Sequence, residues 1–248
     1  MRLDLFLTEA FNIQSRNKAH ELIKSNKVKI DGIIISKPSF NVEAHNKIEL
    51  LEDEFFVSRA AYKLKHFLEE TDIAFKNKEA LDIGSSTGGF TQILLNNGIE
   101  HVTCVDVGSN QLHETLRGNN RITFFENCDI RDFRPNKTFE VVTCDVSFIS
   151  VHHILPAIQT LSSNEIILLF KPQFEVGTNV KRDKKGVVKD NKAIAHARTK
   201  FIDATKNYKW KLEYNAMSKL QGKDGNAEEL FYFTKQNEDN SCVLIKKP

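Results

Sequence analysis

The chain has 248 residues, of which 40% are hydrophobic and 27% are charged, a balance that is typical of a folded protein and excludes a largely disordered one. No apolar run approaches the roughly 20 residues that a membrane helix needs. Asp4 and Glu9 interrupt the N-terminal stretch that a signal peptide keeps apolar. The four cysteines show no CxxC spacing, so neither a disulfide framework nor a zinc site is expected. We therefore expect a cytoplasmic, monomeric protein that binds no metal and does not insert into membranes.

The positive net charge lies entirely in the first 51 residues. They hold eight Lys or Arg against six Asp or Glu, whereas the remaining residues hold 27 of each kind. In one short segment a single acid, Glu21, stands among five basic residues, namely Arg16, Lys18, Lys24, Lys27 and Lys29. This density predicts contacts to nucleic-acid phosphates, although a solvated helix face would have the same composition.

Residues 1–52 predict a small α+β domain of two helices and a hairpin. One helix opens at the N-cap residue Ser15, and two short strands follow on either side of the turn Asp31-Gly32. The order SRNKAHELI, KV, DG, SKP resembles the αL RNA-binding module of a small-subunit ribosomal protein, pseudouridine synthases and tyrosyl-tRNA synthetases. That resemblance implies binding to structured RNA. An acidic and then aromatic linker, residues 53–59, is expected next.

From Ala80 onward the pattern changes to short apolar strands that alternate with helical segments. The strands are ALDIG, HVTCVDVG, ITFFENCDI, FEVVTCDVSF and EIILLFKP. This alternation predicts a doubly wound, mostly parallel α/β sheet whose ligands bind at the carboxyl ends of the strands. We assign this Rossmann-like domain to residues 60–235 and leave residues 236–248 as a tail without a predicted function.

The first strand-to-helix turn predicts a nucleoside site without a phosphate. Its glycines, Gly84, Gly88 and Gly89, follow G-x-x-x-G-G and not the dinucleotide pattern, and the Walker lysine is missing. Asp106 ends the next strand at the position where a carboxylate accepts ribose hydroxyls, and Asp129 ends the third. S-adenosylmethionine fits this description, so a class I methyltransferase domain is expected. The predicted cofactor-binding residues are Asp82, Gly84, Ser85, Ser86, Thr87, Gly88, Gly89, Phe90, Asp106, Val107, Asp129, Ile130 and Asp145.

Four charged residues are candidates for chemistry. Asp145 and Lys171 end the fourth and fifth strands, so they are expected side by side over the pocket. Lys63 lies in an amphipathic helix and Glu228 in a glycine-rich turn before the strand LFYF. Taken singly, Lys63 could be a surface lysine and Glu228 an edge-strand charge.

In combination, the motifs VSRAAYKL, LDIGSSTGGFT, VDVGSNQL, CDVSFIS, FKPQFEVG and GNAEE resemble the TlyA family over nearly the whole chain. The resemblance implies an rRNA 2'-O-methyltransferase with an FtsJ-type catalytic domain, acting on a cytidine ribose. It also implies a catalytic Lys-Asp-Lys-Glu tetrad at Lys63, Asp145, Lys171 and Glu228. The adjacent Glu229 leaves the last assignment open by one residue.

A ribose hydroxyl must lose its proton to attack a methyl group, and we hypothesise that Lys171 accepts that proton. RNA contacts are also predicted in the basic segment after the fifth strand and at two positions near the pocket. These residues are Arg59, Phe148, Lys181, Arg182, Lys184 and Lys185. The alternatives are a core position for Phe148 and a solvated loop for the basic segment.

Three other functions compete with this one. An RNA-binding ribosome assembly factor could carry a silent methyltransferase scaffold, and the older family name suggests a membrane-active haemolysin. Methylation of a base would favour an Asn-Pro-Pro-Tyr-like motif or a catalytic cysteine, and CDVSF offers neither.

Overall fold

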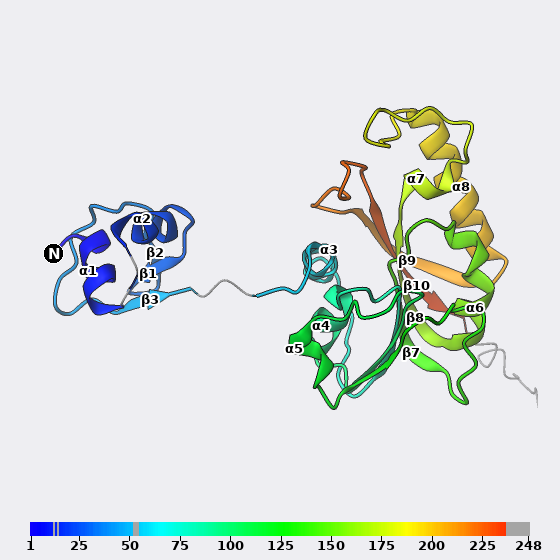
Figure 1. Ribbon diagram of the computed structural model, residues 1–248, viewed down its shortest axis with the longest axis horizontal. Coiled ribbons are helices and arrows are strands. Elements are labelled where there is room, and N and C mark those ends of the chain that lie inside the picture. Colours follow the sequence, from blue (N-terminus) through cyan, green and yellow to red (C-terminus); the bar gives the residue numbers. More distant parts are fainter. Residues whose placement is uncertain (12, 14, 52–54, 237–248) are drawn as a thin grey trace, which may run out of the picture. The chain divides into compact units, whose positions relative to one another are not determined.

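The computed structural model describes residues 1–11, 13, 15–51 and 55–236, and it divides the chain into two compact units, Met1–Phe55 and Phe56–Pro248. Figure 1 shows each unit with its own secondary structure. Positions 53 and 54 of the expected linker, and residues 237–248 of the expected tail, lie outside the described residues.

The N-terminal unit packs two helices on a small antiparallel sheet. The helices are α1 (Leu3–Ala10) and α2 (Arg16–Lys24), and the sheet has the order β2 (Ile33–Ile34), β1 (Val28–Ile30), β3 (Ile48–Leu50). Ser15 Oγ accepts the amide of Lys18 at 3.2 Å, which confirms the predicted N-cap. Asp31 and Gly32 both have positive φ, as a tight hairpin turn requires. Strand β3 was not predicted, because its three residues are half-buried and show no clear alternation.

The second unit is built on a seven-stranded sheet with the order β6-β5-β4-β7-β8-β10-β9. The first five of these strands run parallel, and β10 runs antiparallel to both β8 and β9. The strands are β4 (Glu79–Ile83), β5 (His101–Val105), β6 (Ile122–Phe125), β7 (Phe139–Cys144), β8 (Ser162–Phe170), β9 (Trp210–Met217) and β10 (Glu229–Lys235). The predicted doubly wound α/β fold is confirmed.

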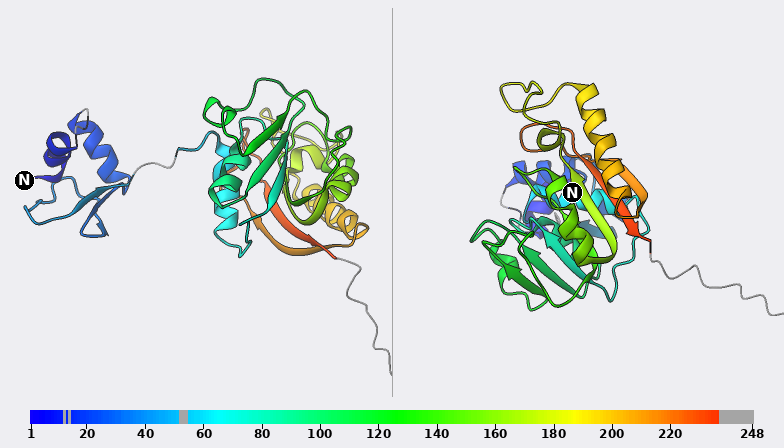
Figure 2. Two further views of the ribbon diagram at one scale, coloured as in Figure 1. Left: turned by 90° about the horizontal axis from the view of Figure 1, so that it is seen from below. Right: turned by 90° about the vertical axis from the view of Figure 1, so that its right-hand side faces the viewer.

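Helices cover both faces of this sheet (Figure 1), and Figure 2 shows the same layers from below. One face carries α3 (Arg59–Leu68), α4 (Gly89–Asn96) and α5 (Glu114–Arg117). The other carries the 3-10 turn η1 (Val151–His153), α6 (Leu155–Leu161), α7 (Pro172–Glu175) and α8 (Asn191–Lys206).

Successive strand residues point into two separate cores. In β4, Ala80 packs with α3 and α4 while Leu81 packs with α6 and α8, and Val141 and Val142 of β7 divide in the same way. A strand that is buried on both faces must be apolar at every position, which explains the unbroken apolar runs in the sequence.

The sheet has its topological switch point between β4 and β7. The chain runs from β4 through β5 to β6 on one side and from β7 to β8 on the other. Connections therefore leave in opposite directions, and a crevice opens at the carboxyl ends of these two strands. The residues that follow β4 and β7 are Gly84 and Asp145.

We predict that Phe201→Ala destabilises the second unit by about 3–5 kcal/mol, because it leaves a large cavity in a closed core. Phe201 is fully buried, and its ring lies 5.1–6.0 Å from those of Phe170, Phe231 and Phe233. Urea denaturation of the full chain measures the effect. The control is Phe148→Ala, at a side chain that is 92% exposed, which should change stability by less than about 0.5 kcal/mol. Equal losses in the two variants would contradict the assignment of this core.

Candidate active site

A cavity of about 320 Å³ lies at the switch point. Seven of the predicted cofactor residues line it, namely Gly84, Ser86, Asp106, Val107, Asp129, Ile130 and Asp145. A smaller hollow of about 170 Å³ adjoins it and is lined by Ser85, Thr87, Gly89, Phe90 and Lys171 together with Ser58 and Ala60 from the start of α3. Gly84, Ser86, Asp145 and Ser147 belong to both spaces, so the cavity opens toward Lys171.

The glycine-rich turn is held close to the neighbouring strands. Gly84 has φ +74°, and a Cβ atom there would lie 2.8 Å from the carbonyl oxygen of Asp145. Asp106 accepts the amide of Ser86 at 2.8 Å and that of Gly108 at 2.7 Å. The Asp106 carboxylate therefore fixes the turn while it lines the cavity.

Two predicted cofactor residues, Asp82 and Gly88, line neither space, so a cofactor contact at these positions stays a prediction. Asp82 is fully buried, where it accepts hydrogen bonds from Thr91 (2.6 Å) and Thr143 (2.8 Å). Burial raises the pKa of Asp82 to about 6. Gly88 has φ +92°, and a Cβ atom there would lie 2.4 Å from the side chain of Leu116. Both residues support the turn from below.

The four predicted tetrad residues form two buried lysine–carboxylate pairs. Lys171 Nζ lies 2.6 Å from Asp145 Oδ1 and donates to Ser147 Oγ at 2.8 Å. Lys63 Nζ donates to Glu228 Oε2 at 2.5 Å, and both of these side chains are more than 90% buried. Such pairs are stable only where each charge has its partner and further hydrogen bonds.

Strand direction brings Glu228 to this edge of the sheet. Because β10 is antiparallel to β8, its first residue, Glu229, pairs with the last residue of β8, Phe170. Glu228 and Lys171 are the next residues along these two strands. Glu229 points elsewhere and pairs with Arg198 at 2.7 Å. This geometry favours Glu228 over Glu229 as the tetrad member.

Sequence reasoning missed several residues around the tetrad. Gln173 Nε2 donates to Glu228 Oε1 at 3.1 Å. A Cβ atom at Gly222 would lie 2.4 Å from the same oxygen, so the glycine leaves room for the carboxylate. Ser147 and Gln173 stand inside motifs that the sequence analysis singled out, but nothing in their spacing indicates a partner. The sequence indicates only that Gly222 belongs to the glycine-rich turn before the strand LFYF.

Comparison with known proteins bears on this arrangement. The FtsJ-like methyltransferase family matches residues 56–235, and the S4 domain matches residues 1–48. The 23S rRNA (cytidine-2'-O)-methyltransferase TlyA of Campylobacter jejuni is 49% identical, over 95% of this chain and 100% of that protein. This chain belongs to the TlyA family. The fold class and the family expected from the sequence are thereby confirmed, and the second unit is an FtsJ-like methyltransferase domain.

Two further members extend the comparison. The 16S/23S rRNA (cytidine-2'-O)-methyltransferase TlyA of Mycobacterium tuberculosis is 35% identical, over 96% of this chain and 91% of that protein. A solved structure from Streptococcus thermophilus, whose name includes the word hemolysin, is 28% identical with a TM-score of 0.70. It covers 96% of this chain and 89% of that one. The similarity therefore includes both units of the TlyA-family chain.

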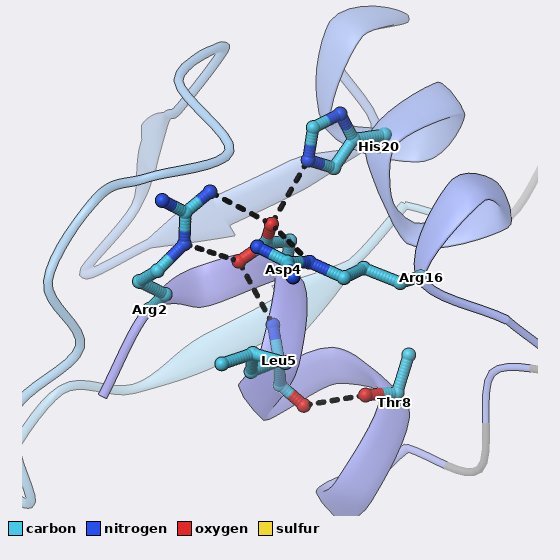
Figure 3. A network of polar contacts seen from close by, with 6 residues as sticks. All are labelled: Arg2, Asp4, Leu5, Thr8, Arg16 and His20. Carbon is cyan, nitrogen blue, oxygen red and sulfur yellow. Dashed lines mark hydrogen bonds and ion pairs between the residues drawn. The ribbon is translucent and has the colours of Figure 1, made fainter.

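The S4 domain of this TlyA-family member gathers cationic side chains around one buried carboxylate, Asp4 (Figure 3). Arg2 and Arg16 donate to Asp4 at 2.8–3.0 Å, and His20 Nε2 lies 2.9 Å from it. The hydrogen bond from Arg2 lowers the pKa of Asp4 far below its usual range. Arg16 was predicted at this surface, whereas Arg2 and His20 were missed because their shared partner is distant in sequence.

The other predicted RNA contacts of the S4 domain differ in their surroundings. Lys24 is exposed, and Lys27 and Lys29 are half-buried on and beside β1. Lys18 forms an exposed pair with Glu21 at 2.9 Å, which offsets part of its charge.

In the methyltransferase unit, Lys181, Lys184 and Lys185 are exposed. Arg182 instead donates to three backbone carbonyl groups, and Arg59 donates to the carbonyl of Gln221 at 3.1 Å.

Phe148 lies at the mouth of the cavity, and the alternative of a core position is wrong. Its side chain is 92% exposed, and its backbone has φ +66°, which is strained for a residue with a side chain. Its ring centroid lies 5.4 Å from that of Phe174.

In the part of the chain that the structure describes, no helix is long and apolar enough to span a bilayer.

We predict that Asp82→Asn removes a pH dependence of stability. With a native pKa of about 6 and an unfolded value of about 3.9, native Asp82 keeps a proton that the unfolded chain has lost. The free energy of unfolding should therefore fall by about 3 kcal/mol as pH rises from 4 to 6 and stay level above that. Urea denaturation at several pH values compares the variant with Asp203→Asn, at an exposed side chain on α8. The same slope for both variants would contradict the prediction.

Proposed function

We propose that this protein transfers a methyl group from S-adenosylmethionine to the 2'-hydroxyl of a cytidine ribose in large-subunit ribosomal RNA, as a monomer in the cytoplasm. The observation that carries the proposal is the pair of buried lysines, each with its carboxylate, beside a cavity that suits a nucleoside. The Campylobacter jejuni relative bears the corresponding name, and the Mycobacterium tuberculosis relative is named for both subunits. Small-subunit rRNA is therefore a second candidate substrate.

The chemistry of the cavity fits S-adenosylmethionine. Among the described residues, its lining includes the carboxylates Asp106, Asp129 and Asp145 and several aliphatic side chains, but no Lys or Arg. A phosphate would have no cationic partner there, whereas ribose hydroxyls and a positive sulfonium group suit carboxylates. Asp106 would hold the ribose, residues of the glycine-rich turn would contact the amino-acid portion, and Val107 and Ile130 would contact the base. When bound, S-adenosylmethionine supplies a methyl group on a sulfur that is a good leaving group.

Lys171 has the position required of the proton acceptor. It lines the hollow next to the cavity, and its Nζ is held by Asp145 and Ser147. For this step Nζ would first give one proton to water. The neutral amine would then accept the proton of the ribose hydroxyl as the new O–C bond forms and the C–S bond breaks, which restores the ammonium that Asp145 pairs with. Lys63 and Glu228 line neither the cavity nor the hollow, so their pair would act by holding α3 and the turn before β10 in place beside Lys171. No step needs a metal ion.

RNA would be held by both units. Arg2, Arg16 and His20 are each about half exposed and are fixed by Asp4, so little side-chain freedom is lost when they meet phosphates. Phe148 offers a bare aromatic face beside the cavity, which suits stacking on an unpaired base. The exposed lysines of the 181–185 segment supply further positive charge.

The rival functions lack comparable support. A silent scaffold has no need of two intact lysine–carboxylate pairs, and titration with S-adenosylmethionine separates it from an active enzyme. A haemolysin would need an apolar segment that enters a bilayer, and we observe no such helix in the described residues.

We predict that Lys171→Ala lowers methyl transfer by about 100- to 10,000-fold, the usual contribution of a general base, while S-adenosylmethionine affinity is kept. Mapping of 2'-O-methyl groups on rRNA from a strain without the gene should find sites that return with the wild-type gene and not with the variant. Lys200→Ala, at an exposed lysine on α8, is the control. Transfer at the wild-type rate by a Lys171→Ala protein that binds the cofactor normally would overturn this mechanism.

We predict that the double reversal Lys184→Glu/Lys185→Glu weakens rRNA binding by about tenfold or more, because it replaces attraction to phosphates by repulsion. Cofactor affinity should not change. Fluorescence anisotropy with an rRNA fragment and calorimetry with S-adenosylmethionine measure the two affinities. The matched control is Lys200→Glu/Lys206→Glu on α8. Equal RNA affinity in both double variants would mean that the 181–185 segment is a solvated loop that does not contact RNA.

A further inference from the structure

Arg182 is an exposed residue, but its guanidinium donates to backbone carbonyl groups of the protein. It lies in the segment between α7 and α8, which we call the basic loop, residues 177–190. Its guanidinium donates to the carbonyl groups of Val180 (2.9 Å), Gln173 (2.9 Å) and Gly177 (3.0 Å). A planar guanidinium can bridge several acceptors at once in this way, which an ammonium group cannot do with the same geometry. Arg182 is thus bonded to Gln173 of α7 through its guanidinium, although it is exposed as Lys184 and Lys185 are.

Gln173 connects this guanidinium to the tetrad. Its carbonyl oxygen accepts from Arg182, and its side-chain Nε2 donates to Glu228 Oε1 at 3.1 Å. The other oxygen of Glu228 accepts from Lys63 at 2.5 Å. Each carboxylate oxygen therefore has one donor, and together the two donors fix the orientation of the Glu228 carboxylate. Gln173 Oε1 is buried without a hydrogen-bond partner among the described residues.

A second connection runs from the basic loop to the turn before Glu228. Asn226 is 97% buried, and its Oδ1 accepts the amide of Val188 at 3.0 Å. Its carbonyl accepts the amide of Gly222 at 2.8 Å, and Gly222 is the residue that leaves room for the Glu228 carboxylate. The loop that carries the exposed lysines is thus bonded to the surroundings of Glu228 at two points.

We propose that Arg182 and Gln173 form a strut that positions Glu228, so that Arg182 acts on methyl transfer through Gln173 and not as a phosphate contact. This inference rests on the proposed function. Neither residue lines the cavity or the hollow, so both are positioning residues. Loss of either member lets the Glu228 carboxylate leave the orientation in which it holds Lys63. The strut is an alternative to the predicted RNA contact of Arg182.

The first test is Gln173→Met, which keeps the length of the side chain and removes the donor. We expect kcat for transfer to large-subunit rRNA to fall about tenfold, the cost of one hydrogen bond to a charged group. KM for RNA and Kd for S-adenosylmethionine should stay within about twofold of the wild type. The matched control is Gln159→Met, which removes the 2.6 Å hydrogen bond to Trp210 in the same unit. It should lower Tm and leave kcat unchanged.

The second test separates a strut from a phosphate contact. Arg182→Lys keeps the charge but loses the fork, and we expect it to lower kcat as much as Arg182→Met does, with little change in KM. Lys184→Met should do the reverse, raising KM and keeping kcat. Because Arg182 and Gln173 act as one unit, the double variant Gln173→Met/Arg182→Met should lose no more kcat than either single variant.

Gln173→Glu gives a readout that a general loss of stability would not move. It places a second carboxyl group against Glu228, and the two would share one proton at low pH. That proton restores the missing donor, so kcat should recover relative to the wild type as pH falls.

Three outcomes would overturn the strut. They are a Gln173→Met protein as active as the wild type, losses that multiply in the double variant, and wild-type kcat in Arg182→Lys with a raised KM in Arg182→Met. A wild-type protein without methyl transfer would overturn the proposed function as well, so the two failures can be told apart.

Discussion

Two lysine ammonium groups are withdrawn from water at one edge of the sheet, and the rest of the site is arranged to keep them paired. A buried charge without a partner costs several kcal/mol, so Lys63 and Lys171 each require a carboxylate at contact distance. The partners come from distant parts of the chain, because Lys63 and Glu228 are separated by 165 positions. Helix α3, the ends of β7 and β8 and the turn before β10 must therefore be folded together before both pairs exist. The geometry of the two pairs and the stability of this edge depend on the same contacts.

The antiparallel direction of β10 decides at which edge of the sheet Glu228 lies. In a parallel sheet, all carboxyl ends meet at one edge, and a residue that precedes a strand lies at the opposite edge. Glu228 precedes its strand, and it reaches the active edge only because β10 runs against β8. Insertion of β10 between β8 and β9 also buries β10 on both sides, so Glu228 starts from a strand that is fixed by two neighbours. Strand β10 thus brings Glu228 to the other three tetrad residues and joins β9 to the rest of the sheet.

The sequence predicted the features that depend on neighbouring residues in the chain and missed those that depend on contacts between distant residues. Apolar runs, the glycine-rich turn and the polar residues at strand ends were enough to predict the sheet and its crevice. In sequence, Asp82 resembles an acid at a strand end that binds a ligand. In the structure it does not line the cavity, and it accepts hydrogen bonds from Thr91 and Thr143. Nothing in the sequence around Gln173 and Arg182 indicates a partner for either residue. Glu228, the partner of Gln173, comes close to it only when β8 and β10 are paired. Short β3 lacks the alternation on which a strand prediction depends.

Two buried aspartates, Asp4 and Asp82, illustrate how each unit uses charge. Asp4 is surrounded by two guanidinium groups and an imidazole. The guanidinium groups of Arg2 and Arg16 keep its carboxylate ionised and leave a net positive surface that is already ordered. Asp82 has only two hydroxyl partners, and burial raises its pKa. A carboxyl group with this pKa is protonated below about pH 6 and ionised above it, so the charge beneath the glycine-rich turn changes around that pH. Of the carboxylates that line the cavity, Asp129 pairs with Arg131 and Asp145 pairs with Lys171, each at 2.6 Å, whereas Asp106 accepts only backbone amides in the hydrogen bonds described above. In the first unit, Arg2 and Arg16 leave positive charge at the surface around Asp4, whereas each buried lysine of the second unit is matched by a carboxylate.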